Sequence, residues 1–301
     1  MTCIVSVNGL GVKFGEFWAV RDVSFSVEVG QIFGFLGANG AGKTTTIRVI
    51  CGLITPTQGQ VTVDGEHFER GREDAIKAKV GYMSQKFTLY NDLSIEENLD
   101  FAATIHGISK ADLRRNKEEL FDLIKLNRAE STLVAQLPSG IKQQVALVAA
   151  LIHQPKLVVL DEPTAGVSPA SRASFWELIR KLTTMGKTVF VTTHYMDEAE
   201  NCDVVALMRS GELIAMGSVP QLKENTFKEQ MYNVTPSPLF SSKDLNELKG
   251  LCKVIEPCGI HYHVLLNAGA DFHTMDRKID VEKIQPSLED VFIQLVEHGG
   301  G

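Results

Sequence analysis

No hydrophobic run in this sequence is long enough to cross a membrane. The longest apolar stretches, such as residues 145–152, fall far short of the ~20 residues that a bilayer requires. Residues 1–7 also lack the basic segment and the long apolar stretch of a signal peptide. We therefore expect a cytoplasmic protein, with any attachment to a membrane made through another chain.

Cysteines and clusters of positive charge are also scarce. The five cysteines are irregularly spaced, and their odd number is typical of reduced thiols in the cytosol. The net charge is −7 and no dense run of lysine and arginine occurs, so the sequence has no electrostatic footprint for nucleic acid. We therefore expect no nucleic-acid partner. The length of 301 residues allows one large domain or two smaller ones.

One cluster of possible metal ligands stands near the C-terminal end. Cys252, Cys258, His261 and His263 follow one another with the spacing C-x5-C-x2-H-x-H. This spacing matches no common structural zinc pattern, and the two histidines alternate as side chains on a strand do. We therefore favour ordinary strand positions over a zinc site.

The most informative feature that is present is the run GANGAGKT at residues 37–44. It fits G-x-x-x-x-G-K-[ST], the loop whose backbone N–H groups cradle nucleotide phosphates. A buried strand is predicted over residues 31–36 and a helix from residue 45, which is the setting that this loop requires. Lys43 would neutralise phosphate charge, and the Thr44 hydroxyl would ligate Mg²⁺. The expected nucleotide-binding residues here are Gly37, Ala38, Asn39, Gly40, Ala41, Gly42, Lys43, Thr44 and Thr45.

Two adjacent carboxylates, Asp161 and Glu162, follow a second predicted buried strand at residues 157–160. An acidic pair at a strand end is often no more than a solvated cap. Beside a phosphate loop, however, the neighbouring strand delivers an acid to the Mg²⁺ site, and Asp161 fits that role. Glu162 points elsewhere and is expected to accept a proton from the attacking water.

Together these residues resemble the nucleotide-binding subunit of ATP-binding cassette (ABC) transporters, over residues 1 to about 220. The resemblance implies that ATP and Mg²⁺ are bound and that Phe14 stacks on adenine. It also implies that Gln85 reaches Mg²⁺ and the attacking water, and that His194 contacts the γ-phosphate. The competing interpretations are a core aromatic for Phe14 and a structural histidine for His194.

The predicted fold class is α/β, with a P-loop NTPase core of the ABC type. Alternating residues near the N-terminus predict an antiparallel β subdomain, and residues 86–155 a helical subdomain. A capping box at Ser94 and Glu97 and an N-cap at Ser168 mark two helix starts. The cassette is expected over residues 1–220, and a small α+β domain over residues 221–301. The acidic segment 196–200 is predicted to be a solvated helix face.

One motif departs from the family's pattern. The family's signature, Leu-Ser-Gly-Gly, stands here as Leu-Pro-Ser-Gly at residues 137–140. In the family this helix start comes from an opposing subunit and donates its serine and backbone N–H groups to the γ-phosphate. Pro138 lacks both the hydroxyl and the N–H, Ser139 replaces a glycine, and Gly140 is retained. The resemblance thus implies a homodimer or heterodimer, and we expect slow but real hydrolysis.

Two short sequence segments, at residues 161–167 and 286–292, resemble those of bacterial exporter subunits. Such subunits pair with a separate permease of the ABC-2 type, and drug-efflux systems are among them. This implies a peripheral protein at the inner face of the membrane, with a cytoplasmic helix of the permease docked on the surface near Gln85 and the helix after Ser94. An exposed apolar groove there would support this docking, and a fully polar surface would count against it. Two other classes stay open. One is a soluble ABC ATPase acting on ribosomes or DNA, although its usual coiled-coil insertions and basic linkers are not visible. The other is a low-turnover nucleotide sensor, which the altered signature favours.

Overall fold

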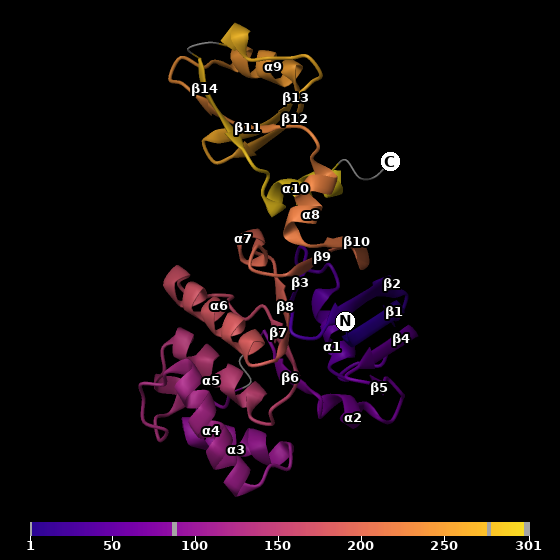
Figure 1. Ribbon diagram of the computed structural model, residues 1–301, viewed down its shortest axis with the longest axis vertical. Coiled ribbons are helices and arrows are strands. Elements are labelled where there is room, and N and C mark those ends of the chain that lie inside the picture. The colour runs from indigo at the N-terminus through magenta and orange to yellow at the C-terminus, as the bar shows by residue number, and fades with distance from the viewer. Residues whose placement is uncertain (1, 86–88, 276–277, 298–301) are drawn as a thin grey trace. The chain divides into compact units, whose positions relative to one another are not determined.

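The structure, a computed structural model, describes residues 2–85, 89–275 and 278–297, and the chain forms two compact units that divide after Ser218. Figure 1 shows the elements along the chain. Those of the first unit are β1 (Cys3–Phe14), β2 (Phe17–Glu28), β3 (Ile32–Leu36), α1 (Lys43–Ile50), β4 (Gln58–Val63), β5 (Glu66–His67), α2 (Glu73–Lys77), β6 (Val80–Met83), α3 (Ile95–Ile105), α4 (Lys110–Ile124), the 3₁₀ turn η1 (Val134–Gln136), α5 (Ser139–Leu151), β7 (Leu157–Asp161), α6 (Pro169–Thr184), β8 (Thr188–Thr193), α7 (Met196–Ala199), β9 (Val204–Arg209) and β10 (Glu212–Gly217).

A six-stranded sheet forms the centre of the first unit, in the order β10-β9-β3-β8-β7-β6. The strands from β9 to β6 are parallel, and β10 pairs antiparallel with β9 at one edge. Every residue of β3, β7 and β8 is buried, which is typical of parallel strands covered on both faces. The carboxyl ends of the parallel strands lie along the same side of the sheet, and folds of this kind bind ligands just beyond those ends.

A second, antiparallel sheet has the order β2-β1-β4-β5. It packs on the central sheet through aromatic rings. The centroid of Phe25 lies 5.4 Å from that of Phe33, 5.5 Å from that of Phe35 and 6.0 Å from that of Phe190. Helix α1 contacts β7 as well as β2 and β4, so it lies between the two sheets. The predicted antiparallel β part and buried strands are therefore confirmed.

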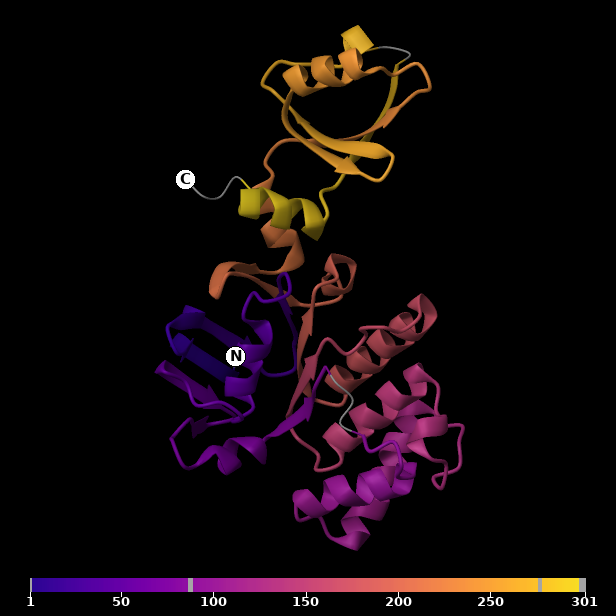
Figure 2. The same ribbon diagram turned by 180° about the vertical axis from the view of Figure 1, so that it is seen from behind.

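The helices α3, α4 and α5 follow β6 and group together at one end of the first unit (Figures 1 and 2). Ser94 and Glu97 form the predicted capping box of α3, because Ser94 Oγ accepts from the N–H of Glu97 at 3.1 Å and Glu97 Oε2 accepts from the N–H of Ser94 at 2.8 Å. Helix α5 contacts β6, α3, α4 and α6, which joins this helical part to the sheet. Ser168 caps α6 as predicted.

The acidic segment 196–200 agrees with the predicted solvated face at Asp197 and Glu200, which are exposed, but not at Glu198. The Glu198 side chain is only 2% exposed. It is buried because two threonine hydroxyls and an arginine supply partners for its carboxylate. The sequence pattern missed this because those partners lie on other elements.

The second unit comprises α8 (Val219–Thr226), β11 (Met231–Pro236), α9 (Ser242–Leu251), β12 (Cys252–Cys258), β13 (His261–Leu266), the 3₁₀ turn η2 (His273–Met275), β14 (Ile279–Ile284) and α10 (Leu288–Glu297). Its antiparallel sheet has the order β12-β13-β11-β14, and α9 packs on β12. A small core of its own forms around Val234, Leu248, Val264 and Met275. This unit is therefore α+β, as predicted.

The histidines of the possible zinc cluster contact other groups. His261 Nδ1 lies 2.7 Å from Thr235 Oγ1, and His263 Nδ1 lies 2.8 Å from Asp290 Oδ1. Within residues 2–85, 89–275 and 278–297, no three histidine, cysteine or acidic side chains come together to hold a metal ion. Among the described helices, none has the length and apolar character needed to span a bilayer.

Candidate nucleotide-binding site

The phosphate loop, residues 37–42, joins β3 to the N-terminus of α1. Gly42 precedes the helix with φ at 105°, a left-handed conformation that favours glycine. A Cβ atom on Gly42 would lie 2.6 Å from the carbonyl oxygen of Ala19, and one on Gly37 would collide with the carbonyl oxygen of Met208. Close packing against two neighbouring strands therefore fixes the shape of this loop.

The Lys43 ammonium lies inside the loop, and its side chain is 5% exposed. It donates to the carbonyl oxygens of Gly37 at 2.6 Å and Ala38 at 3.1 Å, and lies 3.8 Å from Glu162 Oε1. Burial lowers the pKa of Lys43, while the negative charges of Glu162 and Asp161 oppose that shift. The loop thus encloses the positively charged group of Lys43 at the place where it would neutralise the charge of the predicted phosphate.

Asp161 ends β7, and its carboxylate receives two hydroxyl groups. Its Oδ1 accepts from Thr44 Oγ1 at 3.3 Å and from Thr192 Oγ1 at 2.7 Å. Carboxylate and hydroxyl oxygens are the ligands that Mg²⁺ prefers, so Thr44 and Asp161 fit their predicted role as metal ligands. Thr192 was not predicted, because only the pairing of β7 with β8 brings it here.

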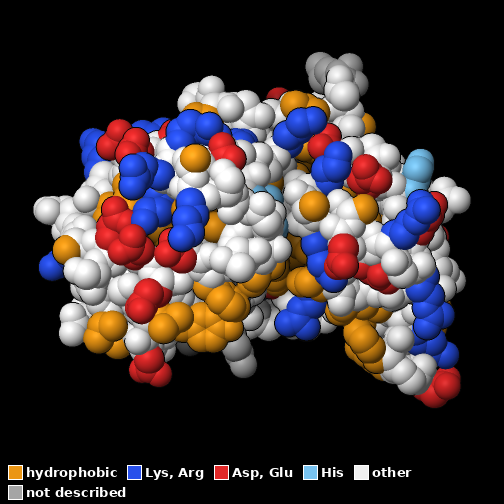
Figure 3. Space-filling model, turned by 90° about the horizontal axis from the view of Figure 1, so that it is seen from below, with side chains coloured by type: hydrophobic (Ala, Val, Ile, Leu, Met, Phe, Trp, Pro, Cys, Tyr) orange, Lys and Arg blue, Asp and Glu red, His pale blue; other side chains and the backbone are white. Residues whose placement is uncertain are grey.

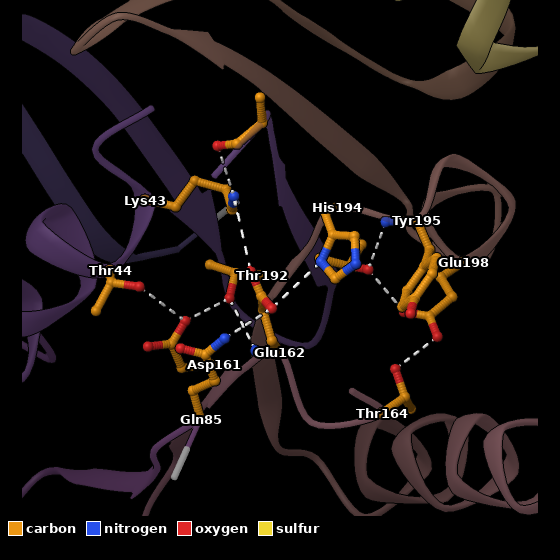
Figure 4. Close-up of polar contacts among 12 residues, drawn as sticks. Lys43, Thr44, Gln85, Asp161, Glu162, Thr164, Thr192, His194, Tyr195 and Glu198 are labelled. Carbon is orange, nitrogen blue, oxygen red and sulfur yellow. Dashed lines mark hydrogen bonds and ion pairs between the residues drawn. The ribbon is translucent and has the colours of Figure 1, made fainter. Parts of the chain in front are cut away.

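Glu162 is buried beside Asp161 and faces two other predicted residues (Figure 4). Its Oε2 accepts from Gln85 Nε2 at 3.0 Å and lies 3.2 Å from His194 Nδ1. Its backbone has φ at 48°, a conformation uncommon outside glycine, held by bonds from its N–H to the carbonyl and hydroxyl oxygens of Thr192. The structure therefore brings Gln85, Glu162 and His194 together next to the phosphate loop.

A cavity of about 410 Å³ opens beside the loop. It is lined by Phe14, Phe17, Ala19, Asn39, Gly40, Gly42, Lys43, Thr44, Thr45, Gln85 and Glu162. Phe14 and Phe17 are opposite residues of the β1–β2 hairpin and are 52% and 66% exposed, which excludes a core position for Phe14. Phe17 was not predicted, although its place three residues after Phe14 across a glycine turn could have indicated it.

We expect Phe14→Ala to weaken MgATP binding by about 5- to 100-fold, since stacking on a base contributes ~1–3 kcal/mol. Isothermal titration calorimetry would measure this change. Val29→Ala is the matched control, because Val29 is also 52% exposed and lies outside the cavity lining. Equal affinity in both variants would contradict the stacking role.

The residues of the altered signature lie apart from this cavity. Pro138 is the N-cap of α5, and its carbonyl oxygen accepts from the N–H groups of Ile141 and Lys142. Pro138 and Ser139 are exposed, Gly140 is partly buried, and none of the three lines the cavity. Within one chain, the structure does not bring them to the other predicted site residues.

An apolar groove of about 310 Å³ lies between α3, α5 and the end of β6. Phe101 and Ile105 of α3 line it and are 46% and 66% exposed. Figure 3 shows hydrophobic side chains gathered along a hollow on this face. His106 and His153 stack at its wall with centroids 3.7 Å apart, and burial lowers the pKa of His153 to about 4. An exposed apolar groove is therefore present beside the helix after Ser94, although Gln85 does not line it.

Comparison with known proteins gives consistent matches. The ABC transporter family matches residues 20–165. The chain is 40% identical over 239 residues to the probable multidrug ABC transporter ATP-binding protein YbhF of Escherichia coli (strain K12), across 79% of this chain and 41% of that protein. The chain thus spans about two fifths of the length of this relative.

Two further similarities cover most of the other protein. The Nod factor export ATP-binding protein I of Rhizobium leguminosarum bv. viciae is 33% identical over 302 residues, across 97% of this chain and 94% of that protein. A solved dimer of the ATP-binding cassette MJ0796, bound to ADP and Pi, is 26% identical with a TM-score of 0.64. It covers 71% of this chain and 98% of that chain.

Proposed function

Because this chain belongs to the ABC transporter family, we propose that it binds and hydrolyses ATP and thereby powers export through a separate membrane permease. The observation that carries the proposal is the Glu162 carboxylate, which Gln85 and His194 contact beside a phosphate loop and its buried lysine. Calorimetry with MgATP and a phosphate-release assay on the purified chain test binding and hydrolysis separately.

In the proposed reaction, the loop N–H groups and Lys43 bind the phosphates, and Phe14 contacts the base. Glu162 accepts a proton from the attacking water, which Gln85 helps to orient, and His194 contacts the γ-phosphate. Thr44, Gln85 and Asp161 would hold Mg²⁺, which neutralises phosphate charge when bound. The geometry supports separate roles for the two carboxylates, because Asp161 accepts from Thr44 whereas Glu162 accepts from Gln85 and lies beside His194.

We infer that two copies, or one copy and a related subunit, form each complete site. The position of Pro138, Ser139 and Gly140 outside the cavity supports this, because a role of these residues at the phosphates would then need a second chain. The similarity to a dimeric cassette supports it as well. Ser168 caps its own helix here, so its hydroxyl has a local role where the family carries an aspartate toward the partner.

The altered signature predicts a gain of activity on reversion. Pro138→Ser combined with Ser139→Gly should raise the ATP turnover about 10- to 100-fold, because a hydrogen bond to a charged phosphate is worth ~1.5–3 kcal/mol in the transition state. Phosphate release at saturating MgATP measures the effect. An unchanged or lower rate would mean that the natural signature is already competent, and turnover near zero in both forms would favour a nucleotide sensor.

The apolar groove supports docking of a permease. An exposed hydrophobic hollow of this kind marks an interaction surface, and an amphipathic helix from a permease would fit between α3 and the core. The names of the relatives favour export over ribosome or DNA work, since they are a multidrug transporter subunit and a Nod factor exporter subunit. The proposed location is the inner face of the membrane, with the permease of the ABC-2 type.

Ile105→Glu should abolish this docking. The side chain is 66% exposed, so the fold should tolerate the change, while a carboxylate in the groove cannot be desolvated cheaply. We expect the membrane-bound fraction of the chain, and the amount of multi-spanning protein that co-purifies with it, to fall at least about tenfold. Leu239→Glu, at a 76% exposed position in the second unit, is the control. Equal membrane association of the two variants would contradict docking in this groove.

A further inference from the structure

Two loops at the edge of the central sheet share one buried carboxylate. The first loop follows β7 and contains Glu162 and Thr164, and the second follows β8 and contains His194 and Tyr195. Figure 4 shows Glu198 of α7 pointing between Thr164 and Tyr195. Thr164 Oγ1 donates to Glu198 Oε1 at 2.5 Å.

The second loop is attached to the same carboxylate. Thr193 Oγ1 donates to Glu198 Oε2 at 2.8 Å and accepts from the N–H of Tyr195 at 2.9 Å. Thr164, Thr193 and Glu198 are all at most 2% exposed, so water does not compete for these bonds. Each oxygen of the carboxylate therefore holds a different loop.

An arginine of α6 closes the arrangement from outside. Arg172 Nε lies 3.2 Å from Glu198 Oε1, and its guanidinium lies 4.1 Å from the ring centroid of Tyr195. The Tyr195 ring in turn lies 4.1 Å from that of His194, whose Nδ1 is 3.2 Å from Glu162. The contacts thus form a closed ring. It runs from Glu162 to His194, then through Tyr195 and Arg172 to Glu198, and back to Thr164, two residues after Glu162.

We propose that Glu198 is a positioning residue that makes these two loops move as one body. When the first loop is displaced, His194 then moves with it. The distance between His194 and Glu162 is thereby kept. The first loop runs on from Thr164 to Ser168, where a partner subunit would meet it. This inference rests on the proposed ATPase function. It adds a path by which closure of the dimer would position the side chain of His194.

Hydrogen exchange tests the coupling without any need for hydrolysis. In the full chain without nucleotide, Thr164→Val should make the amides of residues 194–196 exchange at least about fivefold faster, although Thr164 lies on the other loop. Thr164→Ser keeps the hydroxyl and should restore the wild-type rate. Thr188→Val is the control, since it removes a buried hydroxyl from β8, the strand that precedes residues 194–196, where Thr188 Oγ1 accepts from the N–H of Gly30. Unchanged exchange at residues 194–196 in Thr164→Val overturns the proposal.

A double-mutant cycle tests whether the effect on catalysis passes through His194. Thr164→Val should lower kcat about 10- to 100-fold with the MgATP affinity unchanged, since small misplacements of catalytic groups have effects of this size. In a His194→Ala background the same substitution should cause no further loss. Equal losses in both backgrounds would show that the ring does not act through His194. A wild-type chain without turnover would contradict the ATPase function instead, and the exchange experiment would still decide the coupling.

Discussion

Glu162→Gln should leave MgATP binding within about twofold of the wild type and lower kcat at least about 100-fold, the usual contribution of a general base. Glutamine has the shape of glutamate and can keep a contact with Gln85, but its amide cannot accept the proton of the attacking water. Glu162 takes no part in the Thr44–Asp161 contact, and Lys43 keeps its hydrogen bonds to Gly37 and Ala38, so the substitution should leave the phosphate and metal contacts in place. Calorimetry and phosphate release measure the two quantities separately.

The same variant should also accumulate as a dimer in the presence of MgATP, because association proceeds while the step that separates the subunits is blocked. Size-exclusion chromatography with and without nucleotide would detect this dimer. Glu177→Gln provides a control, since Glu177 is exposed on α6 outside the cavity lining. If Glu162→Gln retains turnover close to that of the control, then Glu162 is not the general base.

The second large effect is expected at Lys43. Lys43→Ala should weaken MgATP binding at least about 100-fold, since a hydrogen bond to a charged group contributes ~1.5–3 kcal/mol and the substitution also removes a buried positive charge. Two buried carboxylates, Asp161 and Glu162, would then face the triphosphate with that charge lost. Titration calorimetry measures the affinity directly.

Two companion variants sharpen this result. Lys43→Arg should not restore binding, because the space around the ammonium is already filled by the carbonyl oxygens of Gly37 and Ala38. Lys79→Ala removes a more exposed lysine that contacts Asp64 and Glu66, and it should bind MgATP normally. Nucleotide affinity retained in Lys43→Ala would contradict the role of this lysine and the location of the phosphates.

Local patterns in the sequence were sufficient for most of the framework. The apolar runs of β3 and of residues 157–160 in β7 are visible in the sequence because parallel central strands are buried on both faces. Capping residues such as Ser94 and Ser168 act within a few residues of themselves, so their roles can be predicted without tertiary structure. The phosphate loop, likewise, is a contiguous motif whose setting can be recognised on either side.

Residues whose roles depend on strand order could not be predicted in this way. Thr192 reaches Asp161 only because β8 pairs in parallel with β7, 31 positions apart along the chain. Glu198 has the appearance of a surface acid within an acidic segment, and its burial follows from Thr164, Thr193 and Arg172 on three other elements. The proposed role of Pro138 would depend on a second chain, about which the sequence of one chain carries little information.

The glycines of the phosphate loop determine how this protein should respond to mutation at its most recognisable motif. Gly37 abuts Met208 on β9 and Gly42 abuts Ala19 on β2, so a methyl group at either position would push against the two sheets themselves. A natural variant there would reduce the yield of soluble, folded protein before it altered any affinity. The shape of the loop is therefore tied to the folding of β2 and β9, on which Ala19 and Met208 lie.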